Sequence, residues 1–246
     1  MHLDERLQAL ADFVPEGCRA ADIGTDHGYL AAALIQQGKA AFVVAGDKNR
    51  GPYEAAIRTV KEQALMENQI AVRLGDGLAV LQPGEVDTVC IAGMGGVLIA
   101  SILEAQPEVT AALGTLVLQP MNGAAELREW LYDNAWHISD ENLVIADGRI
   151  YEVIKAEKGS RKKPGPLDLL VGPKLWQKKP PLMRNHIEEV NRWALRKLPR
   201  QLEENRIEMG YSNSRTCEVG LETNGGIPYQ SIVYLVNEVT RPLSKP

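Results

Sequence analysis

The feature that most constrains the fold is an alternation, over the first 155 or so residues, of short β-branched runs with longer stretches of helical pattern. This alternation is typical of a parallel β-sheet whose faces are covered by helices. The strands of that sheet are expected at residues 19–24, 42–47, 70–75, 87–92 and 115–119. The helices between them are expected near residues 27–37, 51–67, 96–106 and 123–134. The first part of the chain is therefore predicted to be a doubly wound, Rossmann-like α/β domain.

Two further strands, 142–146 and 150–156, are separated only by the turn Asp147-Gly148-Arg149. So short a connection with an Asp-Gly pair predicts an antiparallel hairpin at an edge of the sheet. Five parallel strands followed by a hairpin resemble the strand plan of class I methyltransferases. Other doubly wound folds share the first part of that plan.

The character of the chain changes at residues 159–166, where Gly-Ser-Arg-Lys-Lys-Pro-Gly-Pro continues neither a strand nor a helix. We therefore expect two domains, 1–159 and 160–246. In the second domain, apolar residues at three- and four-residue spacing predict a helix over 181–208. A further helix over 228–240 is expected to fold back along it, which makes the appended domain α-helical and coiled-coil-like.

The net charge of −5 conceals an unequal distribution along the chain. Residues 1–157 carry 11 Lys and Arg against 23 Asp and Glu, a net of −12, whereas residues 158–246 carry 16 against 9, a net of +7. Such an asymmetry points to a polyanionic partner for the basic part, and the alternative is a solvated helical surface.

The sequence Asp22-Ile23-Gly24-Thr25-Asp26-His27-Gly28 ends the first expected strand and begins the first expected helix. In a doubly wound fold, a glycine-containing turn at this place lets a ligand approach the backbone. A dinucleotide-binding turn has a second glycine at position 26, whereas this chain has Asp26, whose carboxylate repels a pyrophosphate. S-adenosylmethionine has no phosphate and carries a sulfonium and an ammonium group. The turn therefore favours this methyl donor over NAD.

Two more acidic residues end expected strands on the same edge of the sheet. Asp47 closes the second strand, 23 residues after Gly24, near the spacing at which an acidic side chain accepts hydrogen bonds from ribose hydroxyls. Asp76, between Gly75 and Gly77 after the third strand, is suited to accept a hydrogen bond from the adenine amino group. The alternative for either acid alone is a solvated residue at a strand end. Their occurrence at successive strands favours a ligand site.

The fourth expected strand leads into Gly93-Met94-Gly95-Gly96. Three glycines in four positions leave room for a flat or bulky group against the backbone, and the alternative is close packing of a helix. The fifth strand closes at Gln119-Pro120 on the same edge, where Gln119 is expected to line the pocket of the methyl acceptor.

Together these residues resemble the bacterial tRNA adenine-22 N1-methyltransferases, the TrmK family. The motifs that carry the resemblance are DIGTDHGYL at 22–30, AGDKNRGPYEAA at 45–56, GDG at 75–77, IAGMGG at 91–96, LQP at 118–120, LREWLYDNAW at 127–136 and YEVI at 151–154. They span nearly all of residues 1–159, and DHGY followed by IAGMGG and LQP is specific to the family.

The resemblance implies a Rossmann-type methyltransferase domain followed by a helical domain that helps to hold tRNA, with S-adenosylmethionine as the cofactor and N1 of adenine 22 as the acceptor. The residues it implies for the cofactor are Asp22, Gly24, His27, Gly28, Asp47, Lys48, Asp76, Gly77, Gly93 and Met94. Those considered for the tRNA substrate are Gly95, Gly96, Gln119, Pro120, Lys162, Lys163, Lys178 and Lys179.

The catalytic candidates follow from the chemistry of the acceptor. Adenine N1 bears an in-plane lone pair that attacks the sulfonium methyl without prior deprotonation, so alignment and exposure of the base are the main tasks. Methylation leaves a cationic base, whose charge or N6 proton a carboxylate or imidazole can take up, and Asp26 and His27 are the candidates. Tyr29 is the candidate to stack on a base turned out of the RNA. Helix capping and packing are the alternatives for Asp26 and His27.

Other properties narrow the class of protein. Cys18, Cys90 and Cys217 are far apart and form no C-x-x-C pair, so reduced thiols and no metal site are expected. No window approaches the roughly 18 consecutive apolar residues of a membrane span, and the start lacks the basic region of a signal peptide, so a cytoplasmic protein is expected. Two other functions stay open: a methyltransferase for a small molecule or protein, and a non-catalytic RNA-binding protein that retains the fold.

Overall fold

The computed structural model describes residues 3–192 of the 246-residue chain. Contacts between residues divide the chain into two compact units, Met1–Lys163 and Pro164–Pro246. Of the described helices, none is both long enough and apolar enough to cross a membrane.

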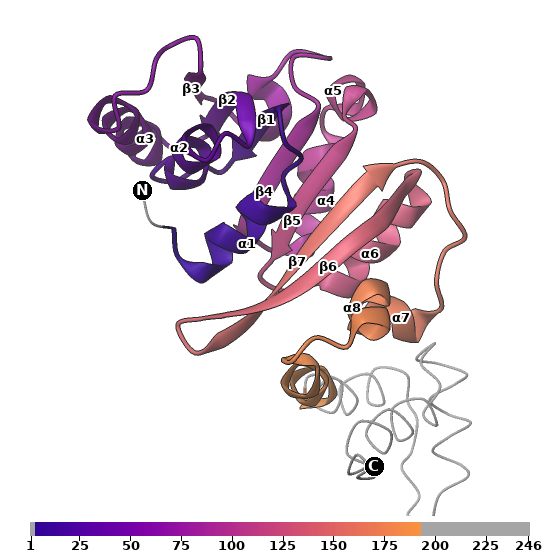
Figure 1. Ribbon diagram of the computed structural model, residues 1–246. Coiled ribbons are helices and arrows are strands. Elements are labelled where there is room, and N and C mark those ends of the chain that lie inside the picture. Colours follow the sequence, from indigo (N-terminus) through magenta and orange to yellow (C-terminus); the bar gives the residue numbers. More distant parts are fainter. Residues whose placement is uncertain (1–2, 193–246) are drawn as a thin grey trace, which may run out of the picture. The chain divides into compact units, whose positions relative to one another are not determined.

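The first unit is built on one seven-stranded sheet with the strand order β3-β2-β1-β4-β5-β7-β6 (Figure 1). Its strands are β1 (Cys18–Ile23), β2 (Ala40–Asp47), β3 (Ile70–Leu74), β4 (Thr88–Met94), β5 (Thr115–Pro120), β6 (Trp136–Ala146) and β7 (Arg149–Lys158). The first five strands are mutually parallel, and β7 runs antiparallel to both β5 and β6. The predicted parallel sheet and its edge hairpin are thus confirmed, in a doubly wound, Rossmann-like arrangement.

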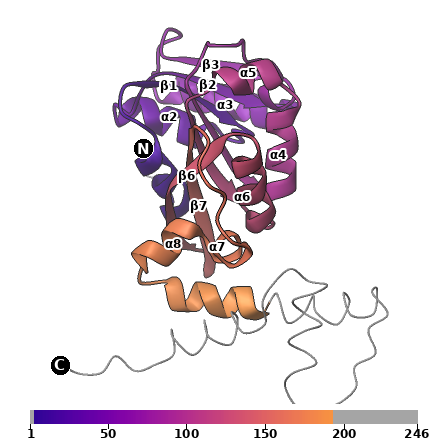
Figure 2. The ribbon, with the colours of Figure 1, turned by 90° about the vertical axis from the view of Figure 1, so that its right-hand side faces the viewer.

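Helices cover both faces of this sheet (Figure 2). They are α1 (Glu5–Phe13), α2 (Tyr29–Gln36), α3 (Arg50–Glu62), the 3-10 helix η1 (Gly77–Val80), α4 (Gly96–Glu104), α5 (Pro107–Ala112) and α6 (Ala124–Asp133). One apolar cluster joins α1, α2 and α3 to the sheet, and a second joins α4, α5 and α6 to its other face.

Strand β1 shows how the sequence supplies both faces. Ala20 belongs to the cluster beneath α1 and α2, whereas Ala21 and Ile23 belong to the cluster beneath α4 and α6. Successive side chains of a strand point to opposite faces, so a strand covered on both sides has to be apolar throughout. This is why the central strands are near-continuous apolar runs.

Several elements differ from the expectation. In the first unit, helices α1, α5 and η1 were not predicted, and β6 begins at Trp136 rather than at 142. Two short helices of the second unit, within residues 166–178, were not predicted either. The first half of β6 contains a register shift between Ile138 and Asp140, and its polar residues interrupt the apolar alternation that signals a strand. Helix α1 does carry a start signal, because the Asp4 Oδ1 accepts a hydrogen bond from the backbone N–H of Leu7 at 2.7 Å.

The second unit contains α7 (Pro166–Val171), α8 (Pro173–Lys178) and a helical stretch at 183–192. Both named helices begin with proline, whose missing N–H costs nothing at the first helical position. The stretch at 183–192 agrees with the start of the helix predicted over 181–208. The remainder of that helix, the one predicted over 228–240 and Cys217 lie outside the described residues.

Candidate active site

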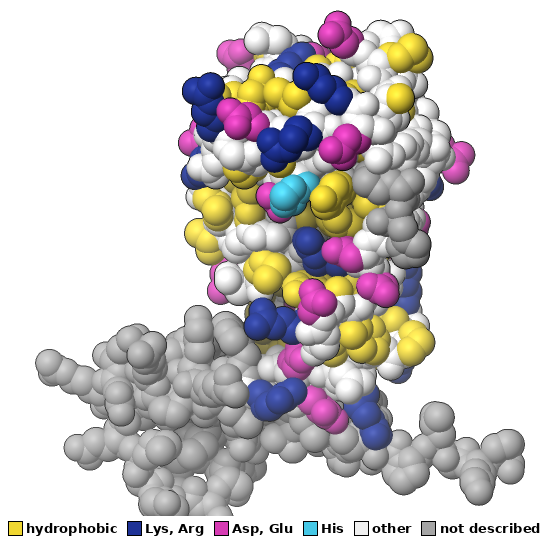
Figure 3. Space-filling view, turned by 90° about the vertical axis from the view of Figure 1, so that its left-hand side faces the viewer, with side chains coloured by type: hydrophobic (Ala, Val, Ile, Leu, Met, Phe, Trp, Pro, Cys, Tyr) yellow, Lys and Arg dark blue, Asp and Glu magenta, His cyan; other side chains and the backbone are white. Residues whose placement is uncertain are grey.

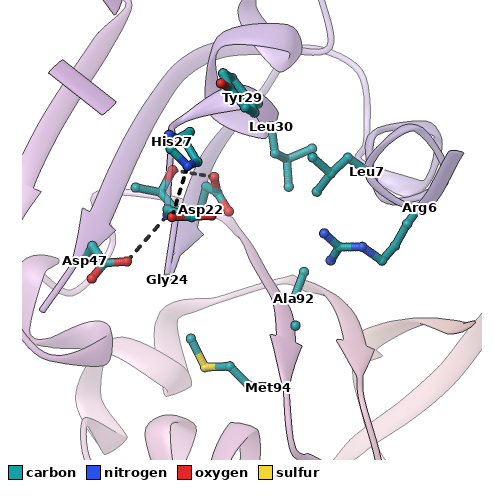
Figure 4. Close-up of a pocket in the computed structure, with 13 residues that line it drawn as sticks. Arg6, Leu7, Asp22, Gly24, His27, Tyr29, Leu30, Asp47, Ala92 and Met94 are labelled. Carbon is teal, nitrogen blue, oxygen red and sulfur yellow. Dashed lines mark hydrogen bonds and ion pairs between the residues drawn. The ribbon is translucent and has the colours of Figure 1, made fainter. Parts of the chain in front are cut away.

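A cavity of about 320 Å³ opens at the carboxyl ends of β1, β2 and β4, with α1 along one side (Figure 4). The residues that line it are Arg6, Leu7, Asp22, Gly24, Thr25, Asp26, His27, Tyr29, Leu30, Asp47, Ala92, Gly93 and Met94. Because the strands are parallel, their carboxyl ends meet at one edge, and this is where doubly wound folds bind ligands. The structure brings the acidic turn after β1, the end of β2 and the glycine segment after β4 to one site.

The turn between β1 and α2 is held by the neighbouring strand. The backbone N–H groups of Gly24 and Thr25 donate to the carbonyl of Gly46 at 2.8 and 3.1 Å. Gly24 has a φ of +75°, a backbone conformation that favours glycine, and a Cβ at this position would overlap Cε of Met94. Gly24 thus lets Met94 lie directly against the turn.

Asp22 is buried beneath this turn, and its carboxylate is held by two donors. Thr25 Oγ1 donates to Asp22 Oδ2 at 2.6 Å, and the backbone N–H of Ala31 donates to the same carboxylate. Burial raises the pKa of Asp22 to about 6, with Asp47 adding to the increase, while Thr25, Ala31 and Arg6 oppose it. A cationic ligand group beside Asp22 would relieve the cost of keeping this carboxylate ionised.

Asp47 ends β2 on the adjoining wall of the cavity and is 8% exposed. Its Oδ1 accepts a hydrogen bond from the backbone N–H of Asn49 at 2.8 Å, and its Oδ2 accepts one from that of Asp26 at 3.4 Å. The side chain is therefore fixed by backbone donors, with lone pairs left toward the cavity.

The three catalytic candidates gather at the mouth of the cavity. Asp26 has a φ of +51°, an uncommon conformation that Asp tolerates better than most residues. His27 Nε2 lies 3.7 Å from Asp26 Oδ1, and the imidazole stacks on the ring of Tyr29 with 5.2 Å between centroids and 14° between planes. The side chains of Asp26 and His27 are 72% and 52% exposed. They are thus open to a large substrate.

Several predicted cofactor residues do not line the cavity. Asp76 is exposed at the N-terminus of η1, and Lys48 is exposed after β2. Gly77 has a φ of +54° and faces Ile102, and Gly28 has a φ of +73° and packs on Ala56 of α3. The two glycines shape the backbone around the site.

The glycines after β4 divide between two roles. Gly93 lines the cavity, and its φ is +74°. Gly96 instead packs on the loop before α6, where a Cβ would overlap the carbonyl oxygen of Gly123 and lie 2.8 Å from its carbonyl carbon. Gly95 faces Asn122, whose Oδ1 would be 3.0 Å from a Cβ. The structure places Gly93 at the cavity and Gly96 in close packing against backbone.

Gln119 lies behind the cavity wall and is fully buried. Its Oε1 accepts hydrogen bonds from Arg6 NH1 at 2.9 Å and from the backbone N–H of Gly93 at 3.1 Å, and its Nε2 donates to the carbonyl of Pro120 at 3.0 Å. Neither Gln119 nor Pro120 is among the residues that line the cavity. These bonds fix the turn at Gly93, which does line the cavity. The place of Gln119 in the acceptor pocket stays a prediction.

Five lining residues were not predicted as site residues. Thr25, Leu30 and Ala92 lie inside motifs that the sequence analysis did identify. The other two, Arg6 and Leu7, lie outside every motif. Both belong to α1, whose signal was the Asp4 cap followed by apolar residues at helical spacing. No local pattern shows that this helix reaches the edge of the sheet, because Arg6 meets Gln119 across 113 residues of sequence.

The predicted lysines lie in both units. In the first unit, Lys162 is exposed, and Lys163 pairs with Glu129 at 2.8 Å and with Asp133 at 2.9 Å. In the second unit, Lys178 and Lys179 are exposed at the end of α8, where Lys179 Nζ lies 5.7 Å from the ring centroid of Trp176. Over residues 3–192 no group of three or more His, Cys, Asp or Glu is arranged to hold a metal ion.

Comparison with known proteins places this chain in a family. The TrmK family, described as tRNA (adenine(22)-N(1))-methyltransferase, matches residues 20–215. The chain is 44% identical over 161 residues to the tRNA (adenine(22)-N(1))-methyltransferase of Bacillus subtilis, covering 65% of this chain and 67% of that protein.

Solved structures agree. The m1A22 tRNA methyltransferase TrmK of B. subtilis matches with a TM-score of 0.78 and 33% identity, covering 98% of this chain and 99% of that one. A putative tRNA (m1A22) methyltransferase of Streptococcus pneumoniae, in complex with S-adenosyl-L-methionine, matches with a TM-score of 0.75 and 35% identity, covering 84% and 94%. With four-fifths of its length matched by the family and these relatives at its side, the chain belongs to the TrmK family of tRNA (adenine(22)-N(1))-methyltransferases.

Proposed function

We propose that the cavity at the ends of β1, β2 and β4 binds S-adenosylmethionine and that the chain transfers its methyl group to N1 of adenine 22 in tRNA. The observation that carries this proposal is the lining of the cavity, where Asp22, Asp26 and Asp47 surround a glycine turn. Three carboxylates suit a donor with a sulfonium and an ammonium, and they repel the pyrophosphate of a dinucleotide. The S. pneumoniae relative holds S-adenosyl-L-methionine.

In this proposal each strand end contacts one part of the donor. Asp47 accepts hydrogen bonds from the ribose hydroxyls, and Gly93 and Met94 lie along the donor opposite Gly24. Asp76, at the end of the neighbouring strand, is proposed to accept a hydrogen bond from the adenine amino group. Lys48, which follows Asp47 in the sequence, is also proposed to contact the donor.

Asp47→Ala is expected to weaken binding of S-adenosylmethionine by about 10- to 100-fold, because hydrogen bonds to a charged group contribute about 1.5–3 kcal/mol. Isothermal titration calorimetry measures the change. Asp87→Ala is the matched control, since Asp87 also accepts a backbone N–H, that of Arg19, but lies at the opposite end of the sheet. Equal affinities of wild type and Asp47→Ala would remove Asp47 from the donor site.

The acceptor base is proposed to enter beside His27 and Tyr29. Adenine N1 attacks the methyl group with its own lone pair, so the protein aligns the base and then takes up the charge that transfer creates. Asp26 and His27 are the nearest titratable groups at the mouth of the cavity, and the exposed ring of Tyr29 provides a surface for stacking.

The second part of the chain is proposed to be an α-helical, coiled-coil-like domain over 160–246 that contacts the tRNA backbone. Its support is the net charge of +7 over residues 158–246. The face in Figure 3 offers no comparable basic area, because the Lys and Arg side chains of the described residues are mixed there with Asp and Glu. The charge of the basic segment is the reason to expect phosphate contacts mainly from it.

Charge reversal of Lys162, Lys178 and Lys179 to Glu is expected to lower tRNA affinity and flatten its dependence on salt. The log–log slope is expected to fall by about 0.7–0.9 for each phosphate that the variant no longer neutralises. Filter binding across a salt series measures both effects. Lys163→Glu is expected to change the slope least, because Glu129 and Asp133 already neutralise Lys163. An unaltered slope in the triple variant would make these lysines ordinary surface charges.

Transfer of labelled methyl groups tests the substrate class. With labelled S-adenosylmethionine, label is expected in total tRNA from cells that lack this modification, and not in protein or small-molecule fractions. Label in either of the other fractions would favour the alternative methyltransferase, and donor binding without transfer to any fraction would favour a non-catalytic RNA-binding protein.

A further inference from the structure

Arg6 is the one Lys or Arg among the described residues that line the cavity. It belongs to α1, before the first strand, whereas the acidic lining residues come from the ends of β1 and β2 and the turn after β1. In Figure 4 its guanidinium extends from α1 toward the interior of the cavity, on the side opposite Asp47. A single cation is thus presented to a site otherwise charged by carboxylates.

The guanidinium is held in place by the cavity wall. Its NH1 donates to Gln119 Oε1 at 2.9 Å, and its central carbon lies 5.9 Å from the ring centroid of Tyr151. Gln119 is itself fixed by Gly93 and Pro120. Among the described residues, Gln119 is the only hydrogen-bond acceptor for Arg6, so other N–H groups of its five-donor fork are left for a ligand.

Asp22 faces the same cavity and does not neutralise Arg6. Arg6 and Asp22, both among the described residues, form no ion pair with each other, although the charge of Arg6 acts on the carboxylate of Asp22. The cavity is thus lined by two opposite charges that do not form an ion pair with each other. Such a pair of charges suits a ligand that carries a positive and a negative group a few ångströms apart. An α-amino acid has this arrangement, with its carboxylate and ammonium on one carbon.

We propose that Arg6 binds the α-carboxylate of the donor's methionine moiety while Asp22 faces its α-ammonium, so that α1 forms part of the donor site. This inference rests on the proposed function, because it assigns one end of S-adenosylmethionine to a subsite of the same cavity. The subsite selects the complete amino acid, since a ligand without its carboxylate leaves the guanidinium without that partner.

The test compares two ligands that share the adenosine and thioether groups. S-adenosylhomocysteine has the amino-acid end, and 5′-methylthioadenosine lacks it. Calorimetry on the full chain is expected to show that Arg6→Gln weakens S-adenosylhomocysteine by about 10- to 100-fold and leaves 5′-methylthioadenosine within about twofold. Arg6→Lys keeps the charge but not the planar fork, so a smaller loss confined to S-adenosylhomocysteine is expected.

Arg19→Gln is the matched control. Arg19 also donates one hydrogen bond, to the carbonyl of Glu85 at 2.8 Å, and also lies over an aromatic ring, that of Phe42 at 4.3 Å. It sits at the opposite end of β1, so both ligands are expected to bind this variant as they bind wild type.

Either of two results with the variants would overturn the assignment. One is equal weakening of both ligands by Arg6→Gln and Arg6→Lys, which marks Arg6 as purely structural, and the other is no weakening of either ligand. Wild-type protein that bound both ligands equally well would also overturn it, because the amino-acid end would then have no subsite. Wild type that bound neither ligand would instead overturn the proposed donor cavity, and the assignment with it.

Discussion

Gly96→Ala is expected to lower the free energy of unfolding by about 3 kcal/mol, at the upper end of what overpacking costs. A Cβ at Gly96 would overlap the carbonyl oxygen of Gly123, and the backbone N–H of Gly96 already donates to the carbonyl of Asn122 at 2.8 Å. Backbone atoms cannot rotate away as a flexible side chain can. Helix α4 has to shift instead, and with it the buried side chains of Ile99 and Leu103.

Gly51→Ala is the matched control for this substitution. Gly51 also lies in the first turn of a helix, α3, but a Cβ there meets nothing within 4 Å. Alanine is favoured over glycine in a helix. The free energy of unfolding of this variant is therefore expected to equal that of wild type or to exceed it by up to about 1 kcal/mol. Urea denaturation measures both variants. Equal stabilities of Gly96→Ala and Gly51→Ala would contradict the close packing of α4 on the loop before α6.

Asp26→Asn and His27→Ala are expected to reduce the rate of methyl transfer by about 100-fold or more, with little change in donor affinity. The two side chains lie at the mouth of the cavity, 3.7 Å apart, where the charge of the methylated base develops. Asn is chosen for Asp26 because it tolerates the φ of +51°, whereas Asp26→Ala adds backbone strain to the loss of charge.

Single-turnover kinetics with tRNA measure the transfer step for these variants, and calorimetry with S-adenosylmethionine measures donor binding separately. Asp12→Ala, which removes an exposed carboxylate that accepts a hydrogen bond from Gln8 on α1, serves as the control. Unchanged transfer in both Asp26→Asn and His27→Ala would remove their catalytic assignment. A fall in donor affinity equal to the fall in rate would make them donor-binding residues.

The sheet was predictable because each strand has a residue pattern that lies within a short stretch of the sequence. Strands β1 to β5 are apolar runs because both of their faces are covered. The same rule predicted that Asp22 and Asp47 lie at one edge, because parallel strands end together. Edge strand β6 was predicted only in part, because its register shift breaks the alternation of its first residues.

The part of the site that could not be predicted from the sequence depends on contacts between segments that are distant in the chain. Gly93 and Gly96 belong to one short motif, yet one faces the cavity and the other the backbone of Gly123, and only the loop before α6 distinguishes them. Arg6 enters the cavity because Gln119 holds it from a strand 113 residues away. The sequence likewise shows which strand end Gln119 occupies, but not that its amide binds Arg6 and Gly93.

Nucleoside analysis of a defined tRNA tests the account most directly. An unmodified transcript with adenosine at position 22 is incubated with S-adenosylmethionine and the protein, digested and analysed by mass spectrometry beside a transcript with guanosine at that position. The account predicts 1-methyladenosine from the first transcript and none from the second. N6-methyladenosine as the product, or equal 1-methyladenosine from both transcripts, would contradict it.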